Sequence, residues 1–253
     1  MKTNQYNGAD PGGSAGARLS IVMPVLDEAA VLPRTLRRLQ GLRAAGHELI
    51  CVDGGSTDGS LERCLGLADH LLRAPRGRAS QMNAGAEAAR GDVLLFLHAD
   101  TVLPQHGAHR VLAALTRPAT SPVTRRARWG FFAVRLDGRG AAFRVIERAM
   151  SLRSRLTGIG TGDQCLFVER ALFQQVGGFP PIALMEDVAL CRILRRAAGA
   201  PAWIDTPVTS SARYWERHGI WRSVLRMWSL RAAYALGTDP ARLHARYYKD
   251  PGR

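Results

Sequence analysis

Short apolar segments with the character of buried strands alternate with helical segments through the first hundred residues of this chain. Four such strands are predicted at residues 19–23, 48–52, 70–73 and 92–97. Helices are predicted at 29–45 and 80–90, with a short one capped by Asp58-Gly59-Ser60. Elements in this order form right-handed βαβ units with parallel strands. The sequence therefore predicts an α/β protein with a mainly parallel central sheet flanked by helices.

The regular alternation stops near residue 116. Residues 116–128 hold prolines and several arginines, which indicates a surface linker. Further strands are predicted at 129–136, 164–169 and 202–204, and further helices at 141–156, from 186 onward and at 219–236. The predicted divisions are an N-terminal tail without fixed structure at 1–17, two halves of one domain at 18–115 and 116–215, and a C-terminal amphipathic helix and tail at 216–253.

Arginine carries nearly all of the positive charge. The chain has 35 basic and 21 acidic residues and a formal net charge of +14, and its lysines are Lys2 and Lys249. The arginines are spread along the chain instead of forming one stripe interleaved with aromatic residues, which argues against a nucleic-acid-binding protein. The positive field favours phosphate-bearing ligands and anionic membrane surfaces.

Cysteine usage and hydropathy bear on the location of the protein. The four cysteines lie far apart in apolar stretches, which is typical of reduced core cysteines in a cytosolic protein. No apolar run follows the N-terminus, and no apolar window of about 18 residues occurs, so neither a signal peptide nor a membrane span is predicted. The expected location is the cytoplasm, with peripheral contact at the inner face of the membrane as an alternative.

Acidic residues are scarce in this basic chain, so the places where they cluster are informative. Asp27-Glu28, Asp53 and Asp100 each follow a predicted strand, and Glu186-Asp187 opens a later helix. Ligands of parallel α/β sheets bind beyond the carboxyl ends of the strands. A single aspartate there is most often a helix cap or a solvated turn, but a series of them predicts a shared site for a metal, a diphosphate and a nucleophile.

The turn that begins at Asp53 combines an acid, two glycines and two hydroxyls before Asp58. Glycine, as at Gly55, lets a ligand approach the backbone closely. The Asp53 carboxylate can accept a hydrogen bond from the edge of a nucleobase. The alternative is a tight turn before a capped helix.

His98 and Asp100 form the candidate metal site. Alternate residues of an extended segment project to the same side, so both side chains could face one ion. A divalent ion there would bridge diphosphate oxygens and neutralise a departing anion. An imidazole beside a carboxylate suits Mn²⁺ better than Mg²⁺. The alternative is that His98 only packs or hydrogen-bonds.

Two clusters in the second half of the chain are candidates for catalysis and for contact with the sugars. Asp187 could serve as a general base within hydrogen-bond reach of an incoming hydroxyl, with Glu186 beside it. The alternative is a pair of acids stabilised by the helix macrodipole. The segment 160–164 could present backbone N–H groups, Asp163 and Gln164 to the donor or acceptor sugar, or be a flexible hairpin loop.

The segment after the last predicted strand contains Arg213, which could hold a diphosphate or be an ordinary surface arginine. The helix that follows has an apolar face flanked by arginines. The residues of that face are Trp221, Leu225, Trp228 and Leu230. Such a face usually packs on the protein's own core. Peripheral membrane contact through this helix is the alternative.

At this point the chain resembles family-2 glycosyltransferases with the GT-A nucleotide-sugar fold. The segments that carry the resemblance lie between residues 19 and 190, in the expected order. They are Ile21-Val22-Met23-Pro24-Val25-Leu26-Asp27-Glu28, Val52-Asp53-Gly54-Gly55-Ser56-Thr57-Asp58, Gly77-Arg78-Ala79-Ser80-Gln81-Met82-Asn83-Ala84-Gly85, Leu95-Phe96-Leu97-His98-Ala99-Asp100-Thr101 and Met185-Glu186-Asp187. The Leu-His-Ala-Asp, Gly-Asp-Gln and Met-Glu-Asp variants resemble a bacterial subgroup labelled arsenosugar-biosynthesis glycosyltransferases.

The resemblance implies a role for each matching position. Pro24, Glu28 and Asp53 would cradle the nucleoside, with Arg78 and Asn83 near the ribose or phosphate. Asp100 would be the metal-binding carboxylate of the D-x-D motif, and Asp187 the general base. Gly54 stands where the family usually has a second aspartate, and His98 stands at the first aspartate of D-x-D. Residues 18–115 would then bind the nucleotide-sugar, and residues 116–215 would supply the acceptor and catalytic side.

These observations predict an inverting glycosyltransferase that moves a sugar from a nucleotide-diphosphate donor to an unidentified acceptor hydroxyl, with Mn²⁺ or Mg²⁺ on the diphosphate. The alternative is a non-catalytic basic protein that binds anionic membrane or nucleic acid. That alternative predicts binding that weakens steeply with salt and ignores nucleotide-sugars.

Overall fold

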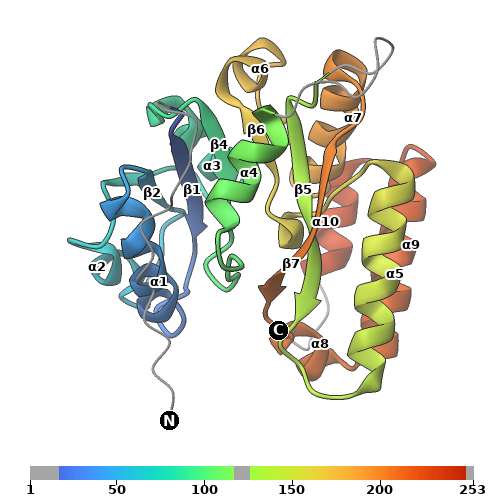
Figure 1. The fold of residues 1–253 in the computed structure, drawn as a ribbon. Helices are drawn as coiled ribbons and strands as arrows, with labels where there is room; N and C mark the ends of the chain where they lie inside the picture. The colour runs from blue at the N-terminus through green and yellow to red at the C-terminus, as the bar shows by residue number, and fades with distance from the viewer. Residues whose placement is uncertain (1–16, 117–125, 249–253) are drawn as a thin grey trace.

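The computed structural model describes residues 17–116 and 126–248, and its centre is a seven-stranded sheet (Figure 1). The predicted tail, except Ala17, and most of the predicted linker lie outside the described residues. The strands are β1 Leu19–Val25, β2 Glu48–Asp53, β3 His70–Arg73, β4 Val93–Phe96, β5 Trp129–Leu136, β6 Phe167–Glu169 and β7 Ala202–Ser210. Their spatial order is β3-β2-β1-β4-β6-β5-β7. Only the pairs made by β6 are antiparallel among these strands, so the predicted mainly parallel sheet is confirmed.

Helices cover both faces of the sheet. They are α1 Leu32–Ala44, α2 Ser60–Cys64, α3 Arg78–Ala88, α4 Gly107–Thr116, α5 Ala141–Thr157, α6 Arg170–Gln175, α7 Glu186–Ala198, α8 Arg213–His218, α9 Ile220–Ala235 and α10 Pro240–Tyr248, with a short 3₁₀ turn at Gly162–Gln164. One apolar core joins the sheet to α1, α2 and α4, and a second joins its other face to α3, α6 and α7. Strands buried on both faces read as continuous apolar runs, which explains why the sequence located them well.

The boundaries of several elements differ from those predicted. Helix α1 begins at Leu32, with Pro33 in its first turn, and not at residue 29. Gln164 was predicted in a strand, but it closes the 3₁₀ turn, where its side chain binds the backbone of Thr161. Helices α4, α6, α8 and α10 were not predicted, and α10 occupies most of the segment predicted as a tail.

Three of the four residues of the apolar face predicted on the C-terminal helix do not pack on the protein's own core. Leu230 is buried, whereas Trp221, Leu225 and Trp228 of α9 are exposed. A second set of aromatic and aliphatic side chains, from α8 and α10, shares the buried side of α9. Within the described residues, no helix combines the length and the apolar character needed to cross a membrane.

The sheet runs without interruption from the first half of the chain into the second. Strand β6 pairs with β4 on one side and with β5 on the other. The chain leaves β1 toward β2, whereas β4 lies on the opposite side of β1. Ligands of open α/β sheets bind at such a switch point, outside the carboxyl ends of the strands. This places the expected site beyond the ends of β1 and β4.

Candidate active site

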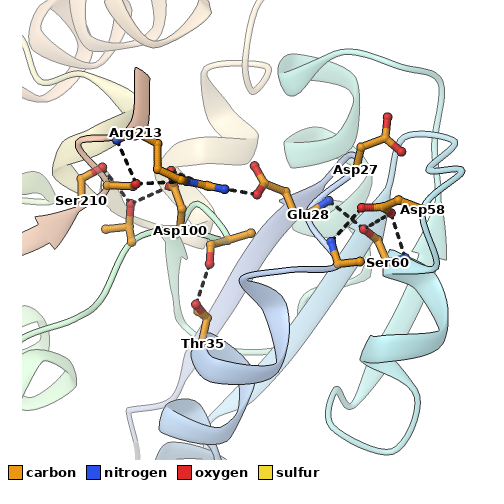
Figure 2. Close-up of polar contacts among 12 residues, drawn as sticks. Asp27, Glu28, Thr35, Asp58, Ser60, Asp100, Ser210 and Arg213 are labelled. Carbon is orange, nitrogen blue, oxygen red and sulfur yellow. Dashed lines mark hydrogen bonds and ion pairs between the residues drawn. The ribbon is translucent and has the colours of Figure 1, made fainter. Parts of the chain in front are cut away.

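Two of the predicted acidic positions meet at this switch point. Glu28 follows β1 and Asp100 follows β4, and Figure 2 shows Arg213 reaching between them from the first turn of α8. The Arg213 Nη2 atom lies 3.2 Å from Glu28 Oε2 and 3.4 Å from Asp100 Oδ2. Burial raises the pKa of Glu28, an effect that the hydrogen bond from Arg213 opposes. Three segments that are far apart in the sequence therefore form one charged cluster.

The turn after β2 is bound to the turn after β1. The buried Asp53 carboxylate accepts hydrogen bonds from the backbone N–H groups of Gly55 (3.0 Å) and Ser56 (3.1 Å). Asp27 accepts one from the Thr57 N–H at 2.8 Å. Gly55 has φ +93°, a conformation that favours glycine. The turn interpretation of this segment is therefore correct, and a nucleobase contact from Asp53 stays a prediction.

Gln81 is a structural residue of this region that the sequence did not single out. Its Nε2 donates hydrogen bonds to the carbonyl oxygens of Val25 and Val52, both at 2.8 Å, at the ends of β1 and β2. A Cβ atom at Gly54 would lie 3.0 Å from the Gln81 amide. The Gln81 side chain thus occupies the space next to Gly54, which gives a physical reason for the missing second aspartate of the turn. Pro24 lies at the same edge, paired with Val52.

His98 lies against the backbone of the 3₁₀ turn. A Cβ atom at Gly162 would be 2.4 Å from His98 Cε1, so the imidazole packs directly on this glycine. His98 Nδ1 is 3.9 Å from Asp163 Oδ1. Burial, with a smaller effect of the Arg78 charge, lowers the pKa of His98 to about 3. The imidazole is therefore neutral at physiological pH and keeps a lone pair.

Asp163 lies beside His98 and is partly accessible. Although 41% of its side-chain surface is accessible, the surrounding protein atoms displace enough water to raise its pKa to about 6. The Arg78 charge opposes this rise, and the carboxylates of Asp100 and Asp187 add to it. Asp163 therefore connects the metal candidate to the base candidate electrostatically.

The Glu186-Asp187 pair begins α7 after an unusual backbone conformation. Met185 has φ +69°, which is rare outside glycine and is found where surrounding structure imposes it. The Asp187 carboxylate accepts hydrogen bonds from Gly162 N at 2.8 Å and from Val188 N at 2.7 Å. Burial and the adjacent Asp187 raise the pKa of the buried Glu186 to about 7. Gly162 thus lies between His98 and Asp187.

Arg78 opens α3 and supplies positive charge to the acidic cluster. Burial alone would lower its pKa, but the carboxylates of Glu186 and Asp163 outweigh burial and raise it. Its side chain nevertheless stays largely exposed. A guanidinium in this setting is available to a phosphate group.

Two predicted binding residues hold the protein's own backbone. Asn83 Nδ2 donates to Phe179 O at 2.8 Å, and Phe179 N donates to Asn83 Oδ1 at 2.9 Å. The fully buried Gln164 accepts a hydrogen bond from Ser154 Oγ at 2.7 Å and donates one to Phe132 O at 3.0 Å. Of these two residues, only Asn83 is still predicted to contact a donor, because Gln164 presents no accessible surface. Gln164 instead fixes the turn that carries Gly162 and Asp163.

The candidate site offers few side chains that could bind a divalent ion. In the ranges that the structure describes, no three His, Cys, Asp or Glu side chains are grouped as a metal site. The partly accessible Asp100 carboxylate and the neutral His98 ring are two donors. Mg²⁺ and Mn²⁺ in sites with phosphates take one or two carboxylates from the protein, with phosphate oxygens and water completing the shell. The residues therefore fit an ion that binds together with a diphosphate.

Sequence comparison finds similarity to bacterial glycosyltransferases. A PGL/p-HBAD biosynthesis glycosyltransferase of Mycobacterium tuberculosis is 38% identical over 96 residues, which span 35% of this chain and 38% of that protein. An undecaprenyl-phosphate 4-deoxy-4-formamido-L-arabinose transferase of Pseudomonas paraeruginosa is 35% identical over 97 residues, which span 34% of this chain and 29% of that protein. The matched region thus covers well under half of these relatives.

Structural comparison extends over more of the chain. The mannosyltransferase PcManGT from Pyrobaculum calidifontis, whose structure contains GDP-Man and Mn²⁺, superposes with a TM-score of 0.60 at 18% identity and covers 95% of this chain and 67% of its own. The fold is therefore GT-A. The sequence model of glycosyl transferase family 2 matches residues 20–175. This chain belongs to glycosyl transferase family 2.

Proposed function

We propose that the protein is an inverting glycosyltransferase that moves a sugar from a nucleotide-diphosphate donor to an acceptor hydroxyl. The proposal rests on two sets of contacts between segments that are distant in the sequence. Arg213 joins Glu28 to Asp100, and Gly162 joins His98 to Asp187. These contacts support a shared site at the switch point, in which a donor and an acceptor could meet.

The donor lies on the side formed by residues 18–115. Pro24, Glu28, Asp53 and Gly55 hold the nucleoside, and Arg78 and Arg213 hold the diphosphate. Asp100, together with His98, holds Mn²⁺ or Mg²⁺, which supplies Lewis-acid stabilisation of the charge on the diphosphate. PcManGT, with its GDP-Man and Mn²⁺, supports this combination of ligands.

Asp187 is the general base. Its two backbone hydrogen bonds fix the orientation of the carboxylate, and a carboxylate retains further lone pairs that can accept a proton from the incoming hydroxyl. Glu186 keeps its proton up to about pH 7, so the pair carries less negative charge before the donor binds. Displacement from the face opposite the leaving diphosphate inverts the anomeric centre.

The substrate class within the family is a finer hypothesis. The Leu-His-Ala-Asp, Gly-Asp-Gln and Met-Glu-Asp variants support membership of the subgroup labelled arsenosugar-biosynthesis glycosyltransferases. The two curated relatives bear the names of different pathways, so they support no single acceptor. Mass spectrometry of the products formed from a panel of nucleotide-sugars would identify both sugar and acceptor.

The proposed base is tested with Asp187→Asn. Transfer should fall by about a thousandfold, because general-base catalysis contributes rate factors of this order. Binding of UDP or GDP with Mn²⁺, measured by calorimetry, should be retained. The matched control is Asp205→Asn on β7, an exposed residue outside the site, which should leave turnover unchanged. Normal turnover of Asp187→Asn would remove Asp187 from the mechanism.

The same calorimetry separates the enzyme from the non-catalytic basic protein. Saturable binding of a nucleoside diphosphate that depends on Mn²⁺ supports the enzyme. Binding that is insensitive to the nucleotide and weakens steeply with salt supports the alternative. Membership of an enzyme family favours the former.

A further inference from the structure

The outward surface of α9 is apolar. Trp221, Leu225 and Trp228 are four and three residues apart, so they form one stripe along the helix, and each is between 67% and 71% exposed. The buried residues of α9, Ser223 and Leu230, lie on the other side of the helix. Two exposed tryptophans on one stripe are unusual for a surface in contact with water alone.

Helix α5 carries a second stripe of the same kind. Val145, Leu152 and Leu156 are seven and four residues apart and are between 57% and 76% exposed. The side of α5 that faces the sheet is formed by Phe143, Ile146 and other buried residues. From the sequence, a helix was predicted at 141–156 without distinguishing its faces, so this stripe was not singled out.

The two stripes lie on neighbouring helices. Phe143, Ile146 and Met150 of α5 share an apolar cluster with Ile220 and Val224 of α9, so the helices are neighbours. Figure 1 shows them alongside each other at the end of the molecule opposite α2. In α5 the exposed stripe lies opposite the side that enters this cluster. In α9 the cluster residues Ile220 and Val224 immediately precede two residues of the exposed stripe, so that stripe borders the cluster. The two stripes, Val145, Leu152 and Leu156 with Trp221, Leu225 and Trp228, are called the outer face below.

The outer face is bordered by arginines. Arg222 of α9 and Arg148 and Arg155 of α5 are exposed, and α9 has no acidic residue. The other arginines of these helices include Arg226, which binds the backbone of α10, and Arg144 and Arg153, which bind groups of the protein's own interior. The one acidic residue of α5, Glu147, is buried and lies 2.8 Å from Arg144. The surface around the apolar stripes is therefore strongly positive.

This charge distribution selects among the partners that could cover an apolar face. A second copy of the chain, paired through the same face, would bring arginines against arginines. An anionic bilayer surface attracts the arginines instead, and each arginine near such a surface contributes favourably to the free energy of membrane binding. Tryptophan rings are suited to the boundary between headgroups and acyl chains. We propose that the outer face of α5 and α9 docks the protein on anionic phospholipid membranes.

Docking there would place the membrane beside the elements that hold the candidate base. Leu230 of α9 and Leu243 of α10 pack against Met185 and Val188, which flank Glu186 and Asp187. The inference goes beyond the proposed function, because the outer face does not include any residue assigned to donor binding or catalysis. Membrane docking would be expected even if neither the sugar donor nor the acceptor were a lipid.

Vesicle flotation with the full chain tests the proposal. The protein should float with phosphatidylcholine vesicles that contain phosphatidylglycerol and stay at the bottom with vesicles of phosphatidylcholine alone. Tryptophan fluorescence should shift to shorter wavelength when the anionic vesicles are added, and this shift should disappear in the double variant Trp221→Ser/Trp228→Ser. Added salt should weaken the binding, because exposed charges are screened.

Single substitutions on the outer face separate the apolar contribution to vesicle binding from the electrostatic one. Trp228→Ser and Leu152→Ser should each lower vesicle affinity about tenfold, from the loss of buried apolar surface. Arg222→Ala should lower it roughly fivefold at low salt. The matched controls are Leu65→Ser and Arg37→Ala, exposed residues in the first half of the chain, which should change nothing. Thermal unfolding of each variant confirms that it is folded.

Two results would overturn the proposal. One is a wild-type chain that does not float with anionic vesicles at low salt. The other is flotation that is reduced equally by Leu65→Ser and Trp228→Ser, which would mean nonspecific adsorption of a basic protein. Sedimentation of a dimer that Trp228→Ser and Leu152→Ser both dissociate, without vesicle binding, would assign the outer face to a second copy.

Discussion

At the scale of single residues, Gly162 has little room for a side chain in the candidate site. Its N–H binds Asp187, and its Cα lies against the His98 ring, so the residue spaces the candidate base from the candidate metal donor. Gly162→Ala would force His98 or the turn to move by about an ångström. A shift of that size near a reaction costs on the order of a hundredfold in rate. We expect this loss in turnover, measured with saturating donor.

Gly41→Ala is the control for that variant. Gly41 lies in α1, and an added Cβ there would meet no atom within 4 Å. The substitution should stabilise the protein by about 0.5–1 kcal/mol, because alanine loses less conformational entropy in a helix. Equal turnover of Gly162→Ala and the wild type would show that the spacing of His98 and Asp187 is not required.

Glu186 makes stability depend on pH. The folded protein keeps the Glu186 proton up to about pH 7, whereas the unfolded chain releases it near pH 4.5. This contribution to stability is therefore fully present below pH 4.5 and is lost as the pH rises through 7, with a magnitude on the order of 2 kcal/mol. Asp163 acts in the same direction up to its pKa of about 6. Urea unfolding of wild type and Glu186→Gln should give similar stabilities near pH 5 and a more stable variant near pH 8.

Glu87→Gln, an exposed substitution on α3, is the matched control for the pH experiment. It should leave the difference between the two pH values unchanged. If Glu186→Gln and the wild type lose stability in parallel across this range, the pH dependence does not come from Glu186.

At the scale of elements, the loop between α6 and α7 decides where the candidate base lies. Asn83 of α3 holds that loop with two hydrogen bonds to the backbone of Phe179. Asn83→Ala should lower the free energy of unfolding by about 2 kcal/mol, since two buried backbone groups lose their partner. Asn83→Asp keeps the acceptor for Phe179 N and should have a smaller effect. Urea unfolding measures both.

Donor kinetics then separate the two roles of Asn83. If the residue holds only the loop, Asn83→Ala should lower kcat with little change in the KM for the donor. An increased donor KM with unchanged stability would instead assign Asn83 to the ribose or phosphate, as the family resemblance implies.

At the scale of the whole molecule, the candidate site combines residues from both halves of one continuous sheet. Glu28 and Asp100 come from the first half and Arg213 and Asp187 from the second, so a ligand that contacts all of them ties the halves together. A nucleoside diphosphate with Mn²⁺ should therefore raise the melting temperature. A ligand present at a hundred times its Kd adds about 2.7 kcal/mol.

Asp100→Asn tests the metal part of that prediction. The variant should still be stabilised by the nucleotide but should lose the additional stabilisation by Mn²⁺, as measured by differential scanning fluorimetry. Asp205→Asn should respond as the wild type does. A full Mn²⁺ effect in Asp100→Asn would mean that the ion binds elsewhere.

Much of the site was accessible to sequence reasoning because strand ends are local features. A buried strand is a continuous apolar run, and the acids that closely follow it lie at the carboxyl edge of the sheet, as for Glu28 and Asp100. Gln81, Asn83 and Gln164 could not be assigned in this way. Their partners include backbone groups 25 or more residues away, namely those of Val25 and Val52 for Gln81, Phe179 for Asn83 and Phe132 for Gln164. No local pattern records such pairings.

By itself the sequence determined the α/β architecture, the parallel strands and the set of acidic positions, because these follow from apolar periodicity and short-range order along the chain. The tertiary structure alone decided that Arg213 reaches Glu28 and Asp100, that Gly162 separates His98 from Asp187, and that the stripes of α5 and α9 stay uncovered. The reason is physical. Contacts between distant segments and the exposure of a helix face depend on how elements pack, and packing is a property of the folded whole.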